Sequence, residues 1–230
     1  MKHEEFTPSV TKRQRDSGFW LDQQPIVTGL LNKTVSEDQL REWVTQFFVT
    51  VTRILRLAHA RPKLPTHLFD EQMKKYMWEN RVEEEYGALS NTAGHIELML
   101  SMCERLGLTR LQMANAKPNA ETRALLDFVA KVCRDEPVVS SQIMLGFVEG
   151  MMPDACARIV EGLKKNYGMS DHDMRFFSVH VYADEEHGEI ARKMVSLVPK
   201  EELDRVADIV LEYTRRFVSM WSSPLLKKAA

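Results

Sequence analysis

Apolar residues recur at intervals of three and four along most of the chain, which is the spacing of one face of an α-helix. The clearest case is residues 35–60, VSEDQLREWVTQFFVTVTRILRLAHA. Ser36 and Gln39 have the spacing of a capping box at its start. Two prolines in residues 60–65 end it, because proline removes a backbone donor. This segment is therefore predicted to be an amphipathic helix with the apolar stripe Leu40, Trp43, Val44, Phe47, Val51 and Leu55.

The same pattern predicts further helices, and no segment alternates apolar and polar residues over a useful strand length. The predicted helices cover residues 19–31, 68–90, 95–106, 108–116, 121–134, 137–167, 170–197 and 201–221. Residues 1–17 are polar and are predicted to form a mobile N-terminal arm. We expect an all-α chain of this length to fold as a single helical-bundle domain over residues 18–230.

Composition narrows the functional classes. The net charge is −2, and no basic block marks a nucleic-acid surface. No apolar run approaches the roughly 18 residues of a membrane span, and the polar N-terminus lacks the apolar core of a signal peptide. The three cysteines are too widely spaced for a zinc motif or a disulfide framework. A cytoplasmic protein is therefore expected.

Three polar residues in the stretch HVYADEEH, residues 180–187, fall on one stripe of their predicted helix. At about 100° per residue, offsets of four and seven return Asp184 and His187 to nearly the direction of His180. Glu185 and Glu186 point elsewhere and are expected to face water. The stripe is either a surface His–Asp pair or a set of metal ligands, since burying an unpaired acid is costly.

Glu149 lies in an otherwise apolar run, QIMLGFVEGMMP. A lone acid in such a run needs a partner or becomes protonated. Pro153 cannot donate a hydrogen bond to the carbonyl of Glu149, so the predicted helix should kink or bulge there. Irregularities of this kind are frequent at functional sites. The alternative is an acid that faces water at one edge of the helix.

A third group of polar residues lies in residues 73–95. Asn80 and Glu84 continue the phase of the apolar methionines of this helix, whereas Glu83 and Glu85 are out of phase and are predicted to be exposed. His95 begins the next predicted helix. Taken alone, the three acids are typical of a solvated face, and a single histidine is typical of a structural residue.

Together, these helices bring three acids and three histidines to one bundle. Carboxylates and histidines that project from facing helices are how dinuclear iron or manganese sites are built. Mixed oxygen and nitrogen ligands with open positions suit iron and O2 chemistry. The sequence therefore predicts a metal site formed by Glu84, His95, Glu149, His180, Asp184 and His187.

At these positions the chain resembles the heme-oxygenase-like diiron oxidases and oxygenases. The family pattern is a glutamate in N-x-x-x-E-x-x-G, a histidine shortly after it, a glutamate on a later helix, and a final H-x-x-x-D-x-x-H. In this chain the pattern falls on Asn80, Glu84 and Gly87, then His95, Glu149, His180, Asp184 and His187, with Glu85 as the alternative to Glu84. The resemblance covers about residues 20–215. It implies a seven-helix bundle, shared with thiaminase II and with the cofactorless last enzyme of pyrroloquinoline quinone synthesis.

The resemblance also implies a reaction. Relatives hold two Fe(II) ions, or a Mn/Fe pair, and use O2 as co-substrate to oxidise a small organic metabolite. Their outcomes include N-oxygenation, desaturation and oxidative C–C cleavage of amino-acid-like or fatty-acid-like substrates, often in specialised-metabolite biosynthesis. An external electron donor and a homodimer are expected, and neither a nucleic acid nor a membrane is expected as partner. The alternatives are a metal-free hydrolase like thiaminase II, with Cys133 or Cys156 reactive, and a non-catalytic interaction module on the same fold.

The chain departs from one member of the family, the chlamydial death-domain-associating protein, which resembles a self-sacrificing p-aminobenzoate synthase and shares the proline at position 153. That protein uses an early tyrosine, and residues 23–31 here contain none. It also has a lysine where this chain has Ile159.

The substrate region is predicted from helix phase alone. An apolar pocket is expected to be lined by Phe47, Phe48, Val51, Met144 and Met152. Four basic residues are in reach of a substrate carboxylate, although a solvated role is commoner for each: Arg53, Arg56, Lys63 and Arg158.

Overall fold

The computed structural model describes residues 1–59 and 70–226, without the side chains of residues 58–59, 72, 76, 183–187 and 226. Within these residues every regular element is helical, which confirms the all-α prediction. The α-helices are α1 (His3–Asp16), α2 (Pro25–Leu31), α3 (Glu37–His59), α4 (Glu71–Tyr86), α5 (His95–Arg105), α6 (Arg110–Ala114), α7 (Ala120–Asp135), α8 (Val138–Glu149), α9 (Met152–Tyr167), α10 (Arg175–Met194) and α11 (Leu203–Leu226). Among the residues described, 3-10 turns lie between α1 and α2 at Leu21–Gln23 and between α10 and α11 at Val195–Leu197 and Lys200–Glu202.

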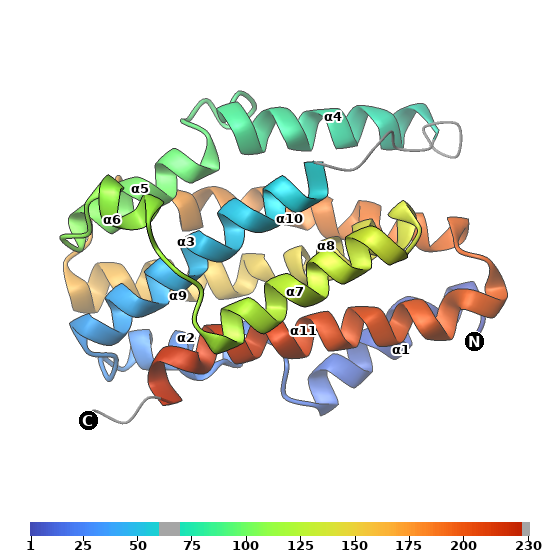
Figure 1. Cartoon of the computed structure of the whole chain (residues 1–230), viewed down its shortest axis with the longest axis horizontal. Helices are drawn as coiled ribbons and strands as arrows, with labels where there is room; N and C mark the ends of the chain where they lie inside the picture. The colour runs from blue at the N-terminus through green and yellow to red at the C-terminus, as the bar shows by residue number, and fades with distance from the viewer. Residues whose placement is uncertain (60–69, 227–230) are drawn as a thin grey trace.

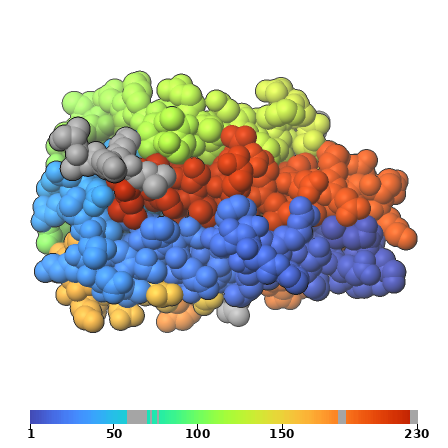
Figure 2. All heavy atoms as spheres, turned by 90° about the horizontal axis from the view of Figure 1, so that it is seen from below, coloured from blue at the N-terminus to red at the C-terminus, as the bar shows by residue number. Residues whose placement is uncertain are grey.

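The N-terminal residues form a packed helix where a mobile arm was expected. Phe6, Val10 and Gln14 of α1 are buried, and their spacing of four places them on one face. This face packs on α11, where the Gln14 side chain donates to Thr214 Oγ1 at 3.0 Å. Figure 2 shows this N-terminal segment lying along α11. A stripe of only three residues in a charged segment was too weak a pattern for the prediction.

Local sequence accounts for several helix starts. Ser36 and Gln39 make the predicted capping box, with distances of 2.9 and 3.2 Å between the side-chain oxygens and the backbone amides. Asp70 caps α4 by accepting from the Met73 amide at 2.7 Å. Ser170 and Asp173 also exchange the predicted hydrogen bonds, although α10 begins slightly later, at Arg175.

The long helix expected over residues 137–167 is two helices. α8 ends at Glu149 and α9 begins at Met152, with Pro153 in its first turn. Proline is tolerated in the first turn because the backbone donor that it lacks has no helical partner there. The kink predicted at Glu149 is therefore a complete break. This break and the additional helices α1, α2 and α6 explain why the described residues form more segments than a bundle of seven long helices.

The longest helices surround one core (Figure 1). α10 packs on α8 and α9, whereas α11 packs on α3, α7 and α8. Aromatic rings of α3, α10 and α11 meet in its centre, with centroids of contacting pairs 5.2 to 6.3 Å apart. α4 lies at the edge of the bundle, against α5 and α10. None of the described helices is long and apolar enough to cross a membrane.

Candidate metal centre

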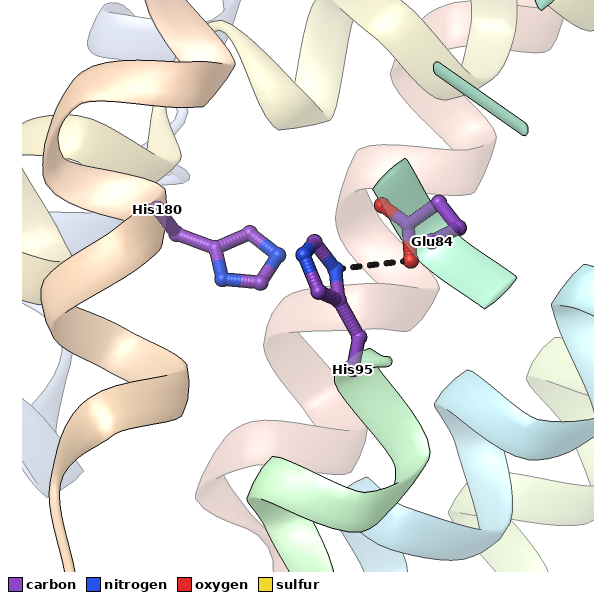
Figure 3. Close-up of side chains that lie close together, drawn as sticks. All are labelled: Glu84, His95 and His180. Carbon is purple, nitrogen blue, oxygen red and sulfur yellow. Dashed lines mark ion pairs between the residues drawn. The ribbon is translucent and has the colours of Figure 1, made fainter. Parts of the chain in front are cut away.

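Three of the predicted ligands lie together. One ligand atom each from Glu84 on α4, His95 at the start of α5 and His180 on α10 falls within 4.8 Å of the others. His95 and His180 are buried, and their ring centroids are 4.6 Å apart. The three side chains converge from separate helices in Figure 3. One carboxylate and two imidazoles in this arrangement are a suitable donor set for iron.

The orientation of His180 is fixed by its own helix. Its Nδ1 lies 2.6 Å from the carbonyl oxygen of Phe176, one turn earlier. An Nδ1–H that donates to a carbonyl leaves Nε2 as the acceptor, and this is the usual way in which a protein sets the tautomer of a ligating histidine. The Phe176 ring packs on the imidazole at 4.3 Å between centroids. His180 therefore offers one nitrogen from a rigid, apolar setting.

A tight loop brings His95 beside Glu84. Gly87 ends α4 with a φ of 63°, the left-handed conformation that favours glycine. A Cβ at this position would lie 2.4 Å from the carbonyl oxygen of Ala93, so the loop also needs glycine for its close return. As a result, His95 Nδ1 lies 2.8 Å from Glu84 Oε2 (Figure 3). The glycine of the N-x-x-x-E-x-x-G motif thus has a direct geometric role.

Glu83 was expected to be exposed, and the structure corrects this. It is only 3% exposed, and its Oε2 accepts from the amides of Leu89 and Ser90 at 2.8 and 3.0 Å. Burial acts to raise the pKa of Glu83, but the hydrogen bonds from Ser90 and Leu89 and the nearby His95 hold that pKa below its ordinary value. Its Oε1 lies 3.5 Å from His95 Nε2. Glu83 therefore ties the loop to α4 and faces the side of His95 away from Glu84.

The geometry distinguishes Glu84 from its alternative, Glu85. The Glu84 side chain is 12% exposed and faces His95. Glu85 is an exposed residue whose carboxylate pairs with Arg81 at 3.0 Å, one helical turn away. Of the two, only Glu84 belongs to the cluster of possible ligands.

A cavity of about 90 Å³ adjoins this cluster. Glu84, His180 and Glu149 all line it, so the predicted acid of α8 reaches the same space as the candidate ligands of α4 and α10. Three predicted substrate-lining residues are present: Phe47, Val51 and Met152. The other two, Phe48 and Met144, are buried in the core and do not line it. Each is the sequence neighbour of a residue that lines the cavity, and one position along a helix turns the side chain by about 100°.

The remaining two predicted ligands, Asp184 and His187, have side chains that lie outside the described residues. Their backbone belongs to α10, one and two turns after His180. Their assignment as ligands therefore stays a prediction from helix phase.

Tyr213 on α11 lines the cavity and was missed by the sequence reasoning. It is almost fully buried, and burial together with the nearby Glu149 carboxylate raises the pKa of its phenol. The hydroxyl thus keeps its proton. The one sequence signal for Tyr213 is that it lies on the same face of its helix as Phe217 and Trp221. Ordinary core residues share this signal, so it does not mark a functional residue.

Comparisons with known proteins identify a family of iron-containing enzymes. A family model described as iron-containing redox enzyme matches residues 41–222. The 4-aminobenzoate synthase of Nitrosomonas europaea is 27% identical over 174 residues, which are 73% of this chain and 69% of that protein. The 4-aminobenzoate synthase of Chlamydia pneumoniae is 24% identical over 176 residues, which are 75% and 74% of the two chains.

Solved structures share the fold. A TenA homolog from Pseudomonas syringae has a TM-score of 0.77 at 11% identity and covers 99% of this chain and 96% of its own. A domain with a heme oxygenase-like fold from Shewanella denitrificans has a TM-score of 0.71 at 15% identity, with 98% and 92% covered. The expected heme-oxygenase-like fold is confirmed, and with most of its length matched by the family model this chain belongs to the iron-containing redox enzymes of that fold.

Proposed function

We propose that the protein is a non-heme diiron enzyme that uses O2 to oxidise a small organic metabolite. The observation that carries this proposal is the convergence of Glu84, His95 and His180 within 4.8 Å, on a cavity that Glu149 also lines. Helix phase adds Asp184 and His187 to the same stripe of α10. Six such residues are enough for two ions with positions left open.

Each residue has a defined task in this proposal. Glu84, His95 and His180 would hold iron from one side of the cavity, and Glu149 from the end of α8. Iron bound here supplies the electrons that O2 needs for reaction with an organic molecule. Phe176, Phe47 and Val148 surround the cavity with apolar surface, which excludes water from the reacting groups.

The proposal also includes a class of substrate and the type of oxidation that it undergoes. An amino-acid-like or fatty-acid-like substrate that undergoes N-oxygenation, desaturation or C–C cleavage fits an apolar cavity of this kind. We also propose that the metal is a pair of Fe(II) ions rather than a Mn/Fe pair. An external electron donor and a homodimer belong to the same proposal. The similarity to 4-aminobenzoate synthases makes 4-aminobenzoate release one outcome to measure, although residue 159 is an isoleucine, fully buried on α9.

The hydrolase alternative has less support. Burial, with a smaller effect of Glu104, raises the pKa of the Cys103 thiol to about 12, so its thiolate is scarce near neutral pH. Neither Cys133 nor Cys156 lines the described part of the cavity. A nucleophilic sulfur is therefore not brought to the cavity by any residue that the structure describes.

The test is anaerobic loading with Fe(II), measurement of bound iron, and mixing with O2. We expect about two iron ions per chain and an absorbance change on mixing with O2. Mass spectrometry after addition of amino acids and fatty acids then identifies any oxidised product. A wild-type chain that folds but takes up no iron would refute the proposal.

The matched variants are His180→Ala and His172→Ala. Both remove a histidine from the same part of the chain, but His172 is exposed and lies outside the cavity. His180→Ala should lose iron and the absorbance change, and His172→Ala should keep both. Equal behaviour of the two variants would contradict the assignment of the site.

A further inference from the structure

A separate pocket lies at the end of the bundle that is on the left in Figure 1. Its volume is about 550 Å³, and it is formed where α2, α5 and α9 end and α3 begins. None of its described lining residues lines the cavity beside the candidate ligands. The candidate metal centre therefore does not account for this pocket.

The described wall of the pocket carries more positive than negative charge. Its cations are Lys33, Arg41 and Arg105, which come from the turn after α2, the first turns of α3 and the end of α5. Among the described lining residues the one acid is Glu37. Such an excess of positive charge attracts an anion.

The three cations are not equally engaged by the protein itself. Arg41 Nε donates to the carbonyl of Leu106 at 2.9 Å, and its other nitrogens pair with two acids of α3 at 3.1 and 3.4 Å. Arg105 lies 3.8 Å from the carboxylate of Asp173, which is too far for a hydrogen bond. Lys33 makes no ion pair with any residue that the structure describes. Lys33 and Arg105 are therefore the charged groups available to a ligand.

The carbonyl groups that end the surrounding helices would repel an anion, but side chains cover several of them. The Asn166 amide donates to the carbonyls of Leu30 and Leu31, at the end of α2, at 2.8 Å each. Arg41 covers the carbonyl of Leu106, at the end of α5. Repulsion by these carbonyl groups is therefore reduced.

The backbone of Lys33 supports a role for its side chain. Its φ of 57° is in the left-handed region, in the turn that ends α2. The Thr34 amide donates to the carbonyl of Gly29 at 2.9 Å and the Lys33 amide to that of Leu30 at 3.4 Å, a Schellman pattern in which glycine is the usual residue. The turns that end α4, α5 and α9 have a glycine in the left-handed conformation: Gly87, Gly107 and Gly168. Lysine is less favourable than glycine in this conformation, so its side chain is expected to contribute more than the turn.

The basic residues that the sequence suggested for a substrate carboxylate lie elsewhere. Arg53, Arg56 and Arg158 do not line the described wall of this pocket, and Arg158 pairs with Asp22 at 3.2 Å. Lys63 lies outside the described residues.

We propose that this pocket binds a phosphomonoester. A phosphate group carries about 1.5 to 2 negative charges near neutral pH and three acceptor oxygens, so it can pair with Lys33 and Arg105 together. A carboxylate has one charge and two oxygens. The volume lies within the roughly 300–1,000 Å³ of small-molecule sites, so there is room for an organic part against Leu106 and the Tyr167 ring. This inference goes beyond the proposed oxidation and does not depend on iron.

The experiment is calorimetric titration of the iron-free full chain at low salt, where charge interactions are least screened. The probes are phenyl phosphate, benzoate, phenol and inorganic phosphate. The pocket variants are Lys33→Gly and Arg105→Gln. The controls are Lys117→Gln and Arg123→Gln, at exposed residues that do not line the pocket. Thermal unfolding of each variant checks the fold.

Phenyl phosphate should bind, and benzoate should bind roughly tenfold more weakly because it loses one contact to a charged group. Phenol, which keeps the ring and lacks the anion, should not bind measurably. Lys33→Gly and Arg105→Gln should each weaken binding of phenyl phosphate by a similar factor, and the controls should keep it. The thermal midpoint of Lys33→Gly should equal or exceed that of wild type, because glycine adopts the left-handed conformation freely.

Absence of phenyl phosphate binding, or equal affinity in wild type and both pocket variants, would overturn the proposal. Inorganic phosphate that binds as tightly as phenyl phosphate would overturn the assignment to an ester in favour of free phosphate. A lower midpoint of Lys33→Gly with unchanged affinity would mean that Lys33 only completes the end of α2. Since every titration uses iron-free protein, these outcomes are independent of those that test the diiron function.

Discussion

Tyr213 carries a hydroxyl into a mostly apolar cavity beside Glu149. The other hydroxyl of the described lining, that of Thr50, is engaged, because it donates to the carbonyl of Gln46 at 2.8 Å. The Tyr213 hydroxyl makes no hydrogen bond to a residue that the structure describes. A hydroxyl in a mostly apolar cavity gains little from its surroundings, so Tyr213 marks a position where function and stability are in conflict.

We expect Tyr213→Phe to stabilise the protein by about 1 kcal/mol, because it removes a hydroxyl from a mostly apolar cavity and leaves no hydrogen-bond partner unpaired among the described residues. Urea unfolding of the iron-free protein measures this. Tyr167→Phe is the matched control: its hydroxyl donates to the carbonyl of Val35 at 2.8 Å, so its removal should cost about 1 kcal/mol. Destabilisation of both variants to the same extent would mean that the Tyr213 hydroxyl is hydrogen-bonded in the fold.

Residue-scale prediction from sequence agrees with the geometry where one helix decides which way a side chain points. Glu84 was chosen over Glu83 because it continues the apolar phase of α4, and the structure brings it to His95. The same phase argument gave the wrong burial for Glu83, since a loop returns over the end of α4 and covers it. Helix periodicity predicts which residues share a face of one helix, whereas burial also depends on which segments pack against that helix.

At the scale of elements, the break between α8 and α9 sets the position of Glu149. α10 crosses this break where two glycines meet. A Cβ on Gly188 would lie 2.7 Å from the Cα of Gly150 and 3.2 Å from an Arg192 nitrogen. Backbone cannot yield as a side chain can, so this contact fixes how closely Glu149 approaches α10.

We expect Gly188→Ala to destabilise the fold by about 1–3 kcal/mol through overpacking, although alanine favours a helix. Iron affinity should also fall, because α8 and α10 move apart and Glu149 moves with α8. Glu189→Ala on the same helix is the control, since Glu189 is exposed and forms a surface pair with Lys193. Thermal unfolding and iron titration measure the two effects, and an unchanged iron affinity in Gly188→Ala would contradict the positioning role.

A second element-scale prediction concerns pH. Glu212 on α11 accepts from Arg215 and Arg216, and Arg216 also donates to the carbonyl of Ala124 on α7. The hydrogen bond from Arg215 lowers the pKa of Glu212, partial burial opposes it, and Arg216 adds to the lowering. The folded pKa thus lies below the unfolded value of 4.5. Glu212 therefore stabilises the fold above pH 4.5, and this contribution is lost as pH falls through the folded pKa.

Thermal unfolding of wild type and Glu212→Gln between pH 3 and pH 7 should reveal this loss. Wild type should be more stable by about 0.5 kcal/mol near neutral pH, a small value because the pair is partly exposed. The difference should shrink below pH 4.5. Glu201→Gln, at an exposed acid before α11, should show no such trend, and a constant difference for Glu212→Gln would argue against an ionic contribution.

For the whole molecule, periodicity predicted the helical class and most helix ranges, because burying one stripe of each helix is the main force in a bundle. It could not predict that α1 packs on α11, since the two are separated by most of the sequence and each stripe fits several neighbours. The candidate site was suggested by a different signal: acids and histidines in phase with apolar residues are costly without a partner. Which residues line the cavity depends on how each helix is rotated about its own axis, so the lining was predicted only in part.

Iron bound at the candidate site would have a structural effect that reaches beyond the site. α4 lies at the edge of the bundle and packs on α5 and α10 (Figure 1). Its surface is rich in charged pairs that add little stability, such as Lys75 with Glu79. Glu84 is the residue through which α4 would share a ligand set with α5 and α10. Iron would therefore tie the least embedded long helix to the core.

Hydrogen exchange should show this difference between helices. At an iron concentration of about 100 times Kd, binding adds roughly 2.7 kcal/mol to the folded state, so amides of α4 that exchange through opening of the site should slow by up to about 100-fold. Amides of α1 that exchange by local opening should be unchanged, because α1 packs on α11 and contributes no ligand. His180→Ala should remove the protection. Uniform slowing of all helices would mean that α4 opens only with the whole molecule, and no slowing in α4 would mean that Glu84 does not bind the metal.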